Sequence, residues 1–186
     1  MAPTPYIVLL RGINVGGNKL VPMVELKALA EKMGFKGATT LLQSGNLVVA
    51  ADSKTSADLE ATFKAALKKR FDFDIDIFVR SGKEWAAIIA DNPFPKEAIA
   101  DPSHLLVMPL EKAISAERLK ALRALIKGRE QVEAVGRTLY CVFPDGIGTS
   151  KFASQLVDRN LGTSGTGRNW NTVQKLAALA GAAGNS

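Results

Sequence analysis

The sequence predicts an α+β fold of two tandem lobes, each built from a small antiparallel sheet covered by helices. The first half alternates strand-like and helix-like segments in the order β-α-β-β-α-β, which is the order of a ferredoxin-like sandwich. The second half shows a similar series of segments, with negligible sequence identity to the first. We therefore expect two ferredoxin-like-related lobes, residues 1–80 and residues 81–186, as βαββαβ followed by αβαββα plus a C-terminal helix.

The first lobe begins with an apolar strand at residues 6–11 and a helix after Pro22. This helix has apolar side chains at helical spacing, and Gly34 follows it as a terminator. Two short strands around Ser44-Gly45-Asn46 predict a hairpin. Thr55 and Asp58 have the spacing of a capping box before the second helix, and residues 74–80 alternate as a half-buried strand.

The second lobe begins at Ser81, which with Glu84 predicts another capped helix. The Pro-rich residues 92–103 are interpreted as a connection to a strand at residues 104–110. A helix from Ser115 to Gly128 and a hairpin turning near Gly136 follow. The last two expected elements are a helix over residues 150–162 and a helix over residues 173–183.

Composition restricts the protein class. Of the 186 residues, 47% are hydrophobic and 23% are charged, which is typical of a globular chain. One cysteine excludes an internal disulfide and is compatible with a reducing compartment. The N-terminal apolar run has no basic region before it and is too short for a membrane span, so the expected location is cytoplasmic, with no membrane partner. The net charge of +6 favours anionic partners.

Several longer motifs resemble a known family. They are YIVLLRGINVGGNKLVPMVELKALAEKMGF, LLQSGNLVV, DNPFP, PDGIGTSK and RNWNTVQKL, and they resemble the bacterial family DUF1697 from about Tyr6 to Leu179. The resemblance implies a two-lobed α+β fold and implies no activity. This chain has Thr166-Gly167 where the family usually has two threonines, so no role is carried over to the second threonine.

The segment RGINVGGNKL, residues 11–20, is close to a P-loop but is not one. Gly12 and Gly17 have the GxxxxG spacing, but Asn18 stands in place of the lysine and Leu20 in place of the Ser or Thr that binds magnesium. A P-loop also requires a parallel sheet, whereas a hairpin follows here. We therefore expect no ATP hydrolysis and no metal-dependent chemistry.

Three glycine-containing stretches precede predicted helix starts and carry basic residues. Amides at a helix N-terminus bind anions, so the three stretches predict one cleft for a phosphate- or carboxylate-bearing small molecule. Arg11 and Arg168 would grip the anion, and Lys151 would neutralise it. The expected ligand-binding residues are Arg11, Asn14, Gly16, Gly17, Lys19, Ser44, Asn46, Lys151, Arg168 and Asn169.

Purely structural interpretations stay open for the same residues. Gly45 suits a hairpin tip, and Asn171 with Gln174 could form an amide variant of the capping box. The basic run RLKALRALIKGR complements a helix dipole without any ligand. His104 and Cys141 are expected to be structural, so the catalytic residues are unknown, with no metal or cofactor expected.

The sequence is compatible with two other function classes besides small-molecule binding. An enzyme acting on the same molecule would use Lys151 as its reactive amine. A nucleic-acid binder would contact phosphates only, because the expected strands lack the aromatic pattern of an RNA-recognition motif. Binding to nucleic acid is not favoured, and the oligomeric state is left open.

Overall fold

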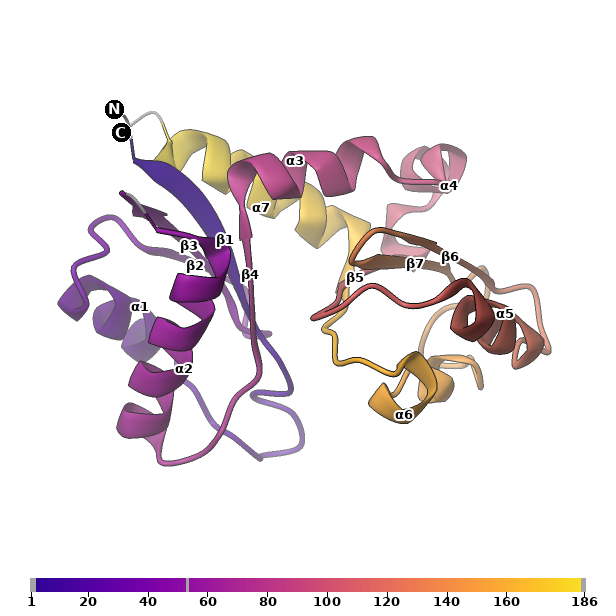
Figure 1. Cartoon of the computed structure of the whole chain (residues 1–186), viewed down its shortest axis with the longest axis horizontal. Helices are drawn as coiled ribbons and strands as arrows, with labels where there is room; N and C mark the ends of the chain where they lie inside the picture. The colour runs from indigo at the N-terminus through magenta and orange to yellow at the C-terminus, as the bar shows by residue number, and fades with distance from the viewer. Residues whose placement is uncertain (1–2, 53, 185–186) are drawn as a thin grey trace. The chain divides into compact units, whose positions relative to one another are not determined.

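The chain forms two four-stranded antiparallel sheets, together with seven α-helices, in a computed structural model that describes residues 3–52 and 54–184 (Figure 1). The predicted α+β class is confirmed. Contacts group the described residues up to Ala87 with those from Lys175 onward, and Ile88–Gln174 form a second unit. The divisions fall inside α3 (Gly82–Ala90) and α7 (Trp170–Ala183). The lobe boundary expected at Ser81 stays a prediction.

The first unit contains a sheet whose central strands are the most apolar. Its strand order is β2-β3-β1-β4, with every neighbouring pair antiparallel. The four strands are β1 (Thr4–Leu10), β2 (Thr39–Leu41), β3 (Asn46–Ala51) and β4 (Ile77–Ser81). Helices α1 (Met23–Lys32) and α2 (Ser56–Phe71) cover one face of this sheet (Figure 1).

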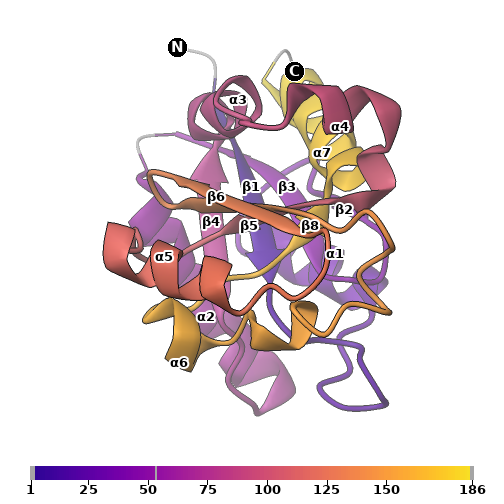
Figure 2. The same ribbon diagram turned by 90° about the vertical axis from the view of Figure 1, so that its right-hand side faces the viewer.

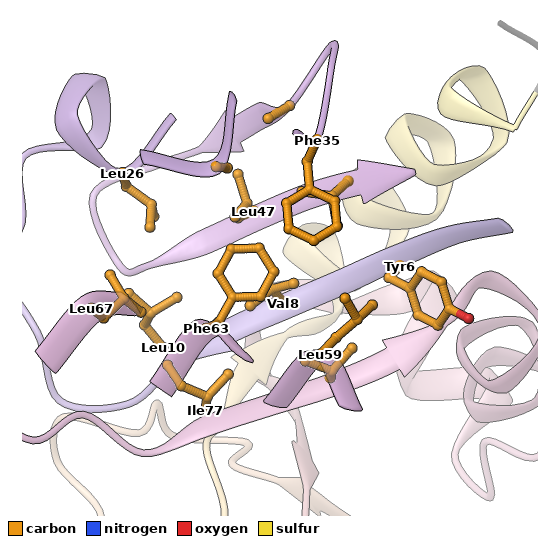
Figure 3. Packing of buried hydrophobic residues seen from close by; sticks show 14 of the residues in the cluster. Tyr6, Val8, Leu10, Leu26, Phe35, Leu47, Leu59, Phe63, Leu67 and Ile77 are labelled. Atoms are coloured by element: carbon orange, nitrogen blue, oxygen red, sulfur yellow. The ribbon is translucent and has the colours of Figure 1, made fainter. Parts of the chain in front are cut away.

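Strand alternation places the core of the first unit. Tyr6, Val8 and Leu10 of β1 point to the same face and pack with α2 side chains such as Phe63 (Figure 3). The Phe63 ring stacks on Phe35 with centroids 5.2 Å apart. The predicted caps hold these elements in place: Thr55 and Asp58 form a complete capping box, and so do Ser81 and Glu84.

The second unit has the strand order β6-β7-β5-β8, again antiparallel throughout. Its strands are β5 (Leu105–Pro109), β6 (Gln131–Val135), β7 (Thr138–Val142) and β8 (Arg168–Asn169). Helices α5 (Ala116–Ala124) and α6 (Asp158–Leu161) lie on the same side of this sheet (Figures 1 and 2). Leu122 and Leu161 from these helices join Leu139 and Phe143 in one core.

Three local expectations for the second unit are corrected. The Pro-rich connection contains a helix, α4 (Pro95–Ala100), with Pro95 at its first turn, followed by the short 3-10 helix η1 (Pro102–His104). Helix α5 ends at Ala124, before the expected stop at Gly128. β8 was not predicted, because two residues are too few for a strand pattern.

Residues 150–162 do not form the single helix expected. A 3-10 helix, η2 (Ala153–Gln155), and the one-turn α6 replace it. The Ser150 hydroxyl accepts hydrogen bonds from the amides of Phe152 and Ala153, and the Asn160 amide donates to the Gln155 carbonyl at 2.7 Å. Such local side-chain bonds to the backbone compete with helix formation.

Candidate functional site

The basic residues of the first glycine loop contact their own unit. Arg11 Nη1 lies 3.4 Å from Asp76 Oδ2, with both side chains partly exposed. Lys19 Nζ donates to the backbone carbonyl of Asp74 at 2.7 Å. Both cations therefore help to attach the loop to the segment before β4.

Asn14 has a structural role in the same loop. It adopts a left-handed backbone with φ 56°, and its side chain accepts from the Val21 amide and donates to the carbonyls of Val21 and Gln43. Gly16 and Gly17 also have positive φ, so the segment is a tight turn. The bond to Gln43 fastens this turn to the β2–β3 hairpin.

The hairpin tip is held together by its own polar groups. Asn46 is fully buried, and its side-chain amide donates to the Leu41 carbonyl at 2.8 Å and to Ser44 Oγ at 3.0 Å. Gly45 has φ 79°, and an added β-carbon there would lie 2.7 Å from Leu10 Cβ. These contacts support the structural interpretation of the tip.

Arg168 and Asn169 lie on β8 at the start of α7. Arg168 is only 7% exposed, and it donates to Thr166 Oγ1 and to the Gly167 carbonyl, each at 2.8 Å. Burial lowers the pKa of Arg168 to about 10. The side-chain oxygen of Asn169, Oδ1, caps α7 by accepting from the Thr172 backbone amide at 2.9 Å, so the cap expected at Asn171 lies two residues earlier.

Lys151 lies in a pocket of about 270 Å³ that belongs entirely to the second unit. Two segments form its walls: residues 125–130, which follow α5, and residues 143–152, which follow β7. The second wall is the glycine-containing stretch DGIGTSKF predicted from sequence. It begins no α-helix, because η2 has only three residues, so the expected helix N-terminus is absent from this stretch.

The acids of this pocket already have partners. Asp145 pairs with Arg129 through both carboxylate oxygens. The Ser150 hydroxyl donates to Glu130 Oε1 and lowers the pKa of that carboxyl, with further lowering by the amides of Glu130 and Gly128. Within the described residues, Glu130 Oε2 is buried and has no hydrogen-bond partner. Because Ser150 is in one wall and Glu130 in the other, their bond joins the two walls.

The two lysines of the pocket have ammonium groups without a protein partner in the described structure. Neither Lys127 Nζ nor Lys151 Nζ forms an ion pair or hydrogen bond within the part of the chain that the structure describes. The apolar floor includes Phe143 and Phe152, which are both buried and have ring centroids 6.3 Å apart. The pocket thus combines an apolar floor with two available positive charges.

Of the ten expected ligand residues, seven lie in the first unit and three in the second. Their convergence on one cleft stays a prediction. Lys127 and Glu130 were missed. In the sequence, the run RLKALRALIKGR suits a helix dipole, but α5 ends three residues before Lys127, which therefore lies in a loop. The sequence signal that could have placed Lys127 near a loop is Gly128, because a glycine limits how far a helix can extend.

Metal-ligating side chains, the single cysteine and apolar helices are the remaining features to place. No group of three His, Cys, Asp or Glu side chains is placed to hold a metal ion there. Cys141 is buried in β7, and burial raises the pKa of its thiol, which disfavours the reactive thiolate. Across residues 3–52 and 54–184, no helix has both the length and the apolar character to cross a membrane.

These features define an α+β protein with two sheet-based units and a small, lysine-lined pocket in the second. Residues 4–140 match DUF1697, described as a protein of unknown function, and the chain belongs to this family. The fold is similar to that of the conserved bacterial protein SP0830 from Streptococcus pneumoniae. The two share 20% identity with a TM-score of 0.74, over 96% of this chain and 99% of that chain. No curated protein matches the sequence.

Proposed function

We propose that the protein binds a phosphate- or carboxylate-bearing small molecule in the lysine pocket of its second unit. The observation that carries the proposal is that the acidic groups of the pocket have protein partners and its lysines do not. Asp145 and Glu130 are engaged by Arg129 and Ser150, whereas Lys127 and Lys151 have no partner in the described structure. With Asp145 paired to Arg129, the two lysines outnumber the remaining carboxylate of Glu130, so the net charge left for a ligand is positive.

The size of the pocket also supports a small ligand. Sites for drug-sized molecules commonly have about 300–1,000 Å³, so 270 Å³ suits a small metabolite. The Phe143–Phe152 floor would contact the apolar part of the ligand, and the lysines would neutralise the anion at the opening. Lysine can serve here as a mobile point charge that does not need bidentate geometry.

Other expectations belong to the same proposal. The strand order β2-β3-β1-β4 supports a ferredoxin-like assignment for the first unit. The Arg11–Lys19 loop, Ser44, Asn46, Arg168 and Asn169 are proposed to assist binding. Because several of these side chains already bond to groups of their own unit, Lys127 and Lys151 are the primary candidates for binding the anion. We also propose a cytoplasmic location.

A thermal-shift titration with inorganic phosphate, citrate and sugar phosphates tests the proposal. A bound anion at ten times its Kd stabilises the wild type by about 1.4 kcal/mol. Lys127→Ala and Lys151→Ala should each reduce this stabilisation, and Lys120→Ala is the matched control because Lys120 is exposed on α5 outside the pocket. If no anion stabilises the wild type, or if all three variants respond like it, the proposal is wrong.

The same titration distinguishes the contribution of the arginines. If Arg11 and Arg168 hold the ligand, the Arg11→Ala, Arg168→Ala double variant should lose more affinity than Lys151→Ala. A nucleic-acid backbone binder would instead lose affinity steeply with salt, through many lysines at once. Turnover of an anionic metabolite that disappears in Lys151→Ala would favour the enzyme alternative.

A further inference from the structure

The only histidine of the chain lies beside the lysine pocket and has an ordered partner. His104 Nδ1 is 2.5 Å from Asp101 Oδ2, and the Ser103 hydroxyl donates to the other oxygen of the same carboxylate at 2.9 Å. The His104 carbonyl accepts from the Phe143 amide at 2.9 Å, which ties this turn to the start of the pocket wall. The Asp101 contact therefore orients the imidazole, and the backbone bond fixes the position of the turn.

The second ring nitrogen of His104 is available. Nε2 has no hydrogen-bond partner within the described residues, and it is not among the buried polar atoms that lack one, so solvent reaches it. A β-carbon added to Gly146 would lie 3.7 Å from Nε2 and 4.0 Å from Thr149 Oγ1. Gly146 and Thr149 both line the pocket, so Nε2, although His104 itself is not a lining residue, lies next to Gly146 in the wall that carries Lys151.

We propose that His104 Nε2 is a third anion-binding group of the pocket, which makes a phosphate group the preferred ligand. This inference rests on the proposed function of the pocket. A phosphate group presents three strong acceptor oxygens, which match three separate donors on Lys127, Lys151 and His104. A carboxylate offers two oxygens and one charge, so it uses this set less fully.

The Asp101 contact decides which form of the His104 ring can bind an anion. With Nδ1–H donated to Asp101, Nε2 donates to an anion as part of an imidazolium. Other charges lie on the elements around this turn. The pocket wall carries Lys151 and the Arg129-paired Asp145, and α4 and β8, which contact η1, carry Lys96, Glu97 and Arg168. The carboxylate of Asp101 is the one that contacts the ring.

A proton NMR titration of the full chain tests the inference directly, since a single histidine gives one set of imidazole signals. Inorganic phosphate should move these signals saturably at pH 6, and acetate at equal ionic strength should not. His104→Gln should weaken phosphate binding about ten-fold at pH 6, as expected for loss of a charge-assisted bond. A variant that binds phosphate as tightly as the wild type would contradict the assignment of His104 to the site.

The possible outcomes separate this inference from the function on which it rests. If Lys127→Ala and Lys151→Ala weaken phosphate binding while the histidine signals stay still, His104 is not part of the site and the pocket proposal survives. Equal responses to acetate and phosphate overturn the phosphate preference. If the wild type binds neither anion, both proposals fail. The imidazole signals of the wild type show whether His104 contacts the bound phosphate even if His104→Gln does not fold.

Discussion

At the scale of single residues, the amide side chains of the glycine-rich stretches are used to satisfy nearby backbone groups. Asn14, Asn46 and Asn169 each bond to the backbone of a turn or a helix start. Sequence alone could not separate these roles from ligand binding, because a ligand and an unpaired amide or carbonyl present the same donors and acceptors. Lys127 Nζ and His104 Nε2, by contrast, have no hydrogen-bond partner within the described residues.

Gly45→Ala should strongly destabilise the protein. Its φ of 79° strains any side chain, and the added methyl group would lie 2.7 Å from Leu10 Cβ and 2.8 Å from Ile13 Cδ1. We expect a loss of about 2–4 kcal/mol in the free energy of unfolding, measured by urea denaturation. Gly37→Ala is the control for strain alone, because its φ is 72° and nothing lies within 4 Å of the new carbon. Equal losses in the two variants would contradict the close packing at the hairpin tip.

Cys141 should be inert in the folded protein. It is fully buried in β7, and burial raises the pKa of its thiol, so the thiolate needed for reaction with disulfide reagents is scarce. We expect negligible modification by a chromogenic disulfide at pH 8 and complete modification in urea. Rapid labelling without denaturant would show that β7 opens readily.

At the scale of elements, predictions succeeded where a segment has both a clear period and a capping signal. The helices that begin after Thr55, at Ser81 and after Ser115 were predicted from caps that the structure contains. The differences lie in the second unit, and the largest of them follows β7. Residues 150–162 contain good helix formers, but Ser150 and Asn160 bond the backbone locally, and neither bond has a periodic signature.

Glu84 should contribute to stability in a pH-dependent manner. Despite desolvation, which acts in the opposite direction, hydrogen bonds from Ser56 and Ser81 and the charge of Arg80 lower the pKa of this carboxyl. Since the folded pKa lies below the unfolded value, the contribution is present above about pH 4.3 and is lost as the pH falls through the folded pKa. Glu84→Gln should therefore cost about 1 kcal/mol at pH 7. In urea denaturation at several pH values, this difference should shrink towards pH 3, and a constant difference would contradict the assignment.

At the scale of the whole molecule, the sequence predicts two tandem lobes, and contacts among the described residues group those from Lys175 onward with the first unit. A boundary inferred from the order of elements assumes that each lobe is continuous in sequence. The helical pattern of residues 173–183 predicts α7 but carries no information about which sheet it joins, because its apolar stripe would suit either one. The pocket was predictable only in part for the same reason: DGIGTSKF was visible as a motif, but the wall that faces it was not.

Leu176 tests which unit α7 stabilises. Its side chain is fully buried, and it belongs to the part of α7 grouped with the first unit. Leu176→Ala should cost about 2–5 kcal/mol and increase amide hydrogen exchange in β1 and β3, with Lys175→Ala as an exposed control on the same helix. The exchange pattern is more informative than the loss of stability, since each sheet reports separately. Increased exchange confined to β5 and β7 would instead assign the helix to the second unit, as the boundary expected at Ser81 requires.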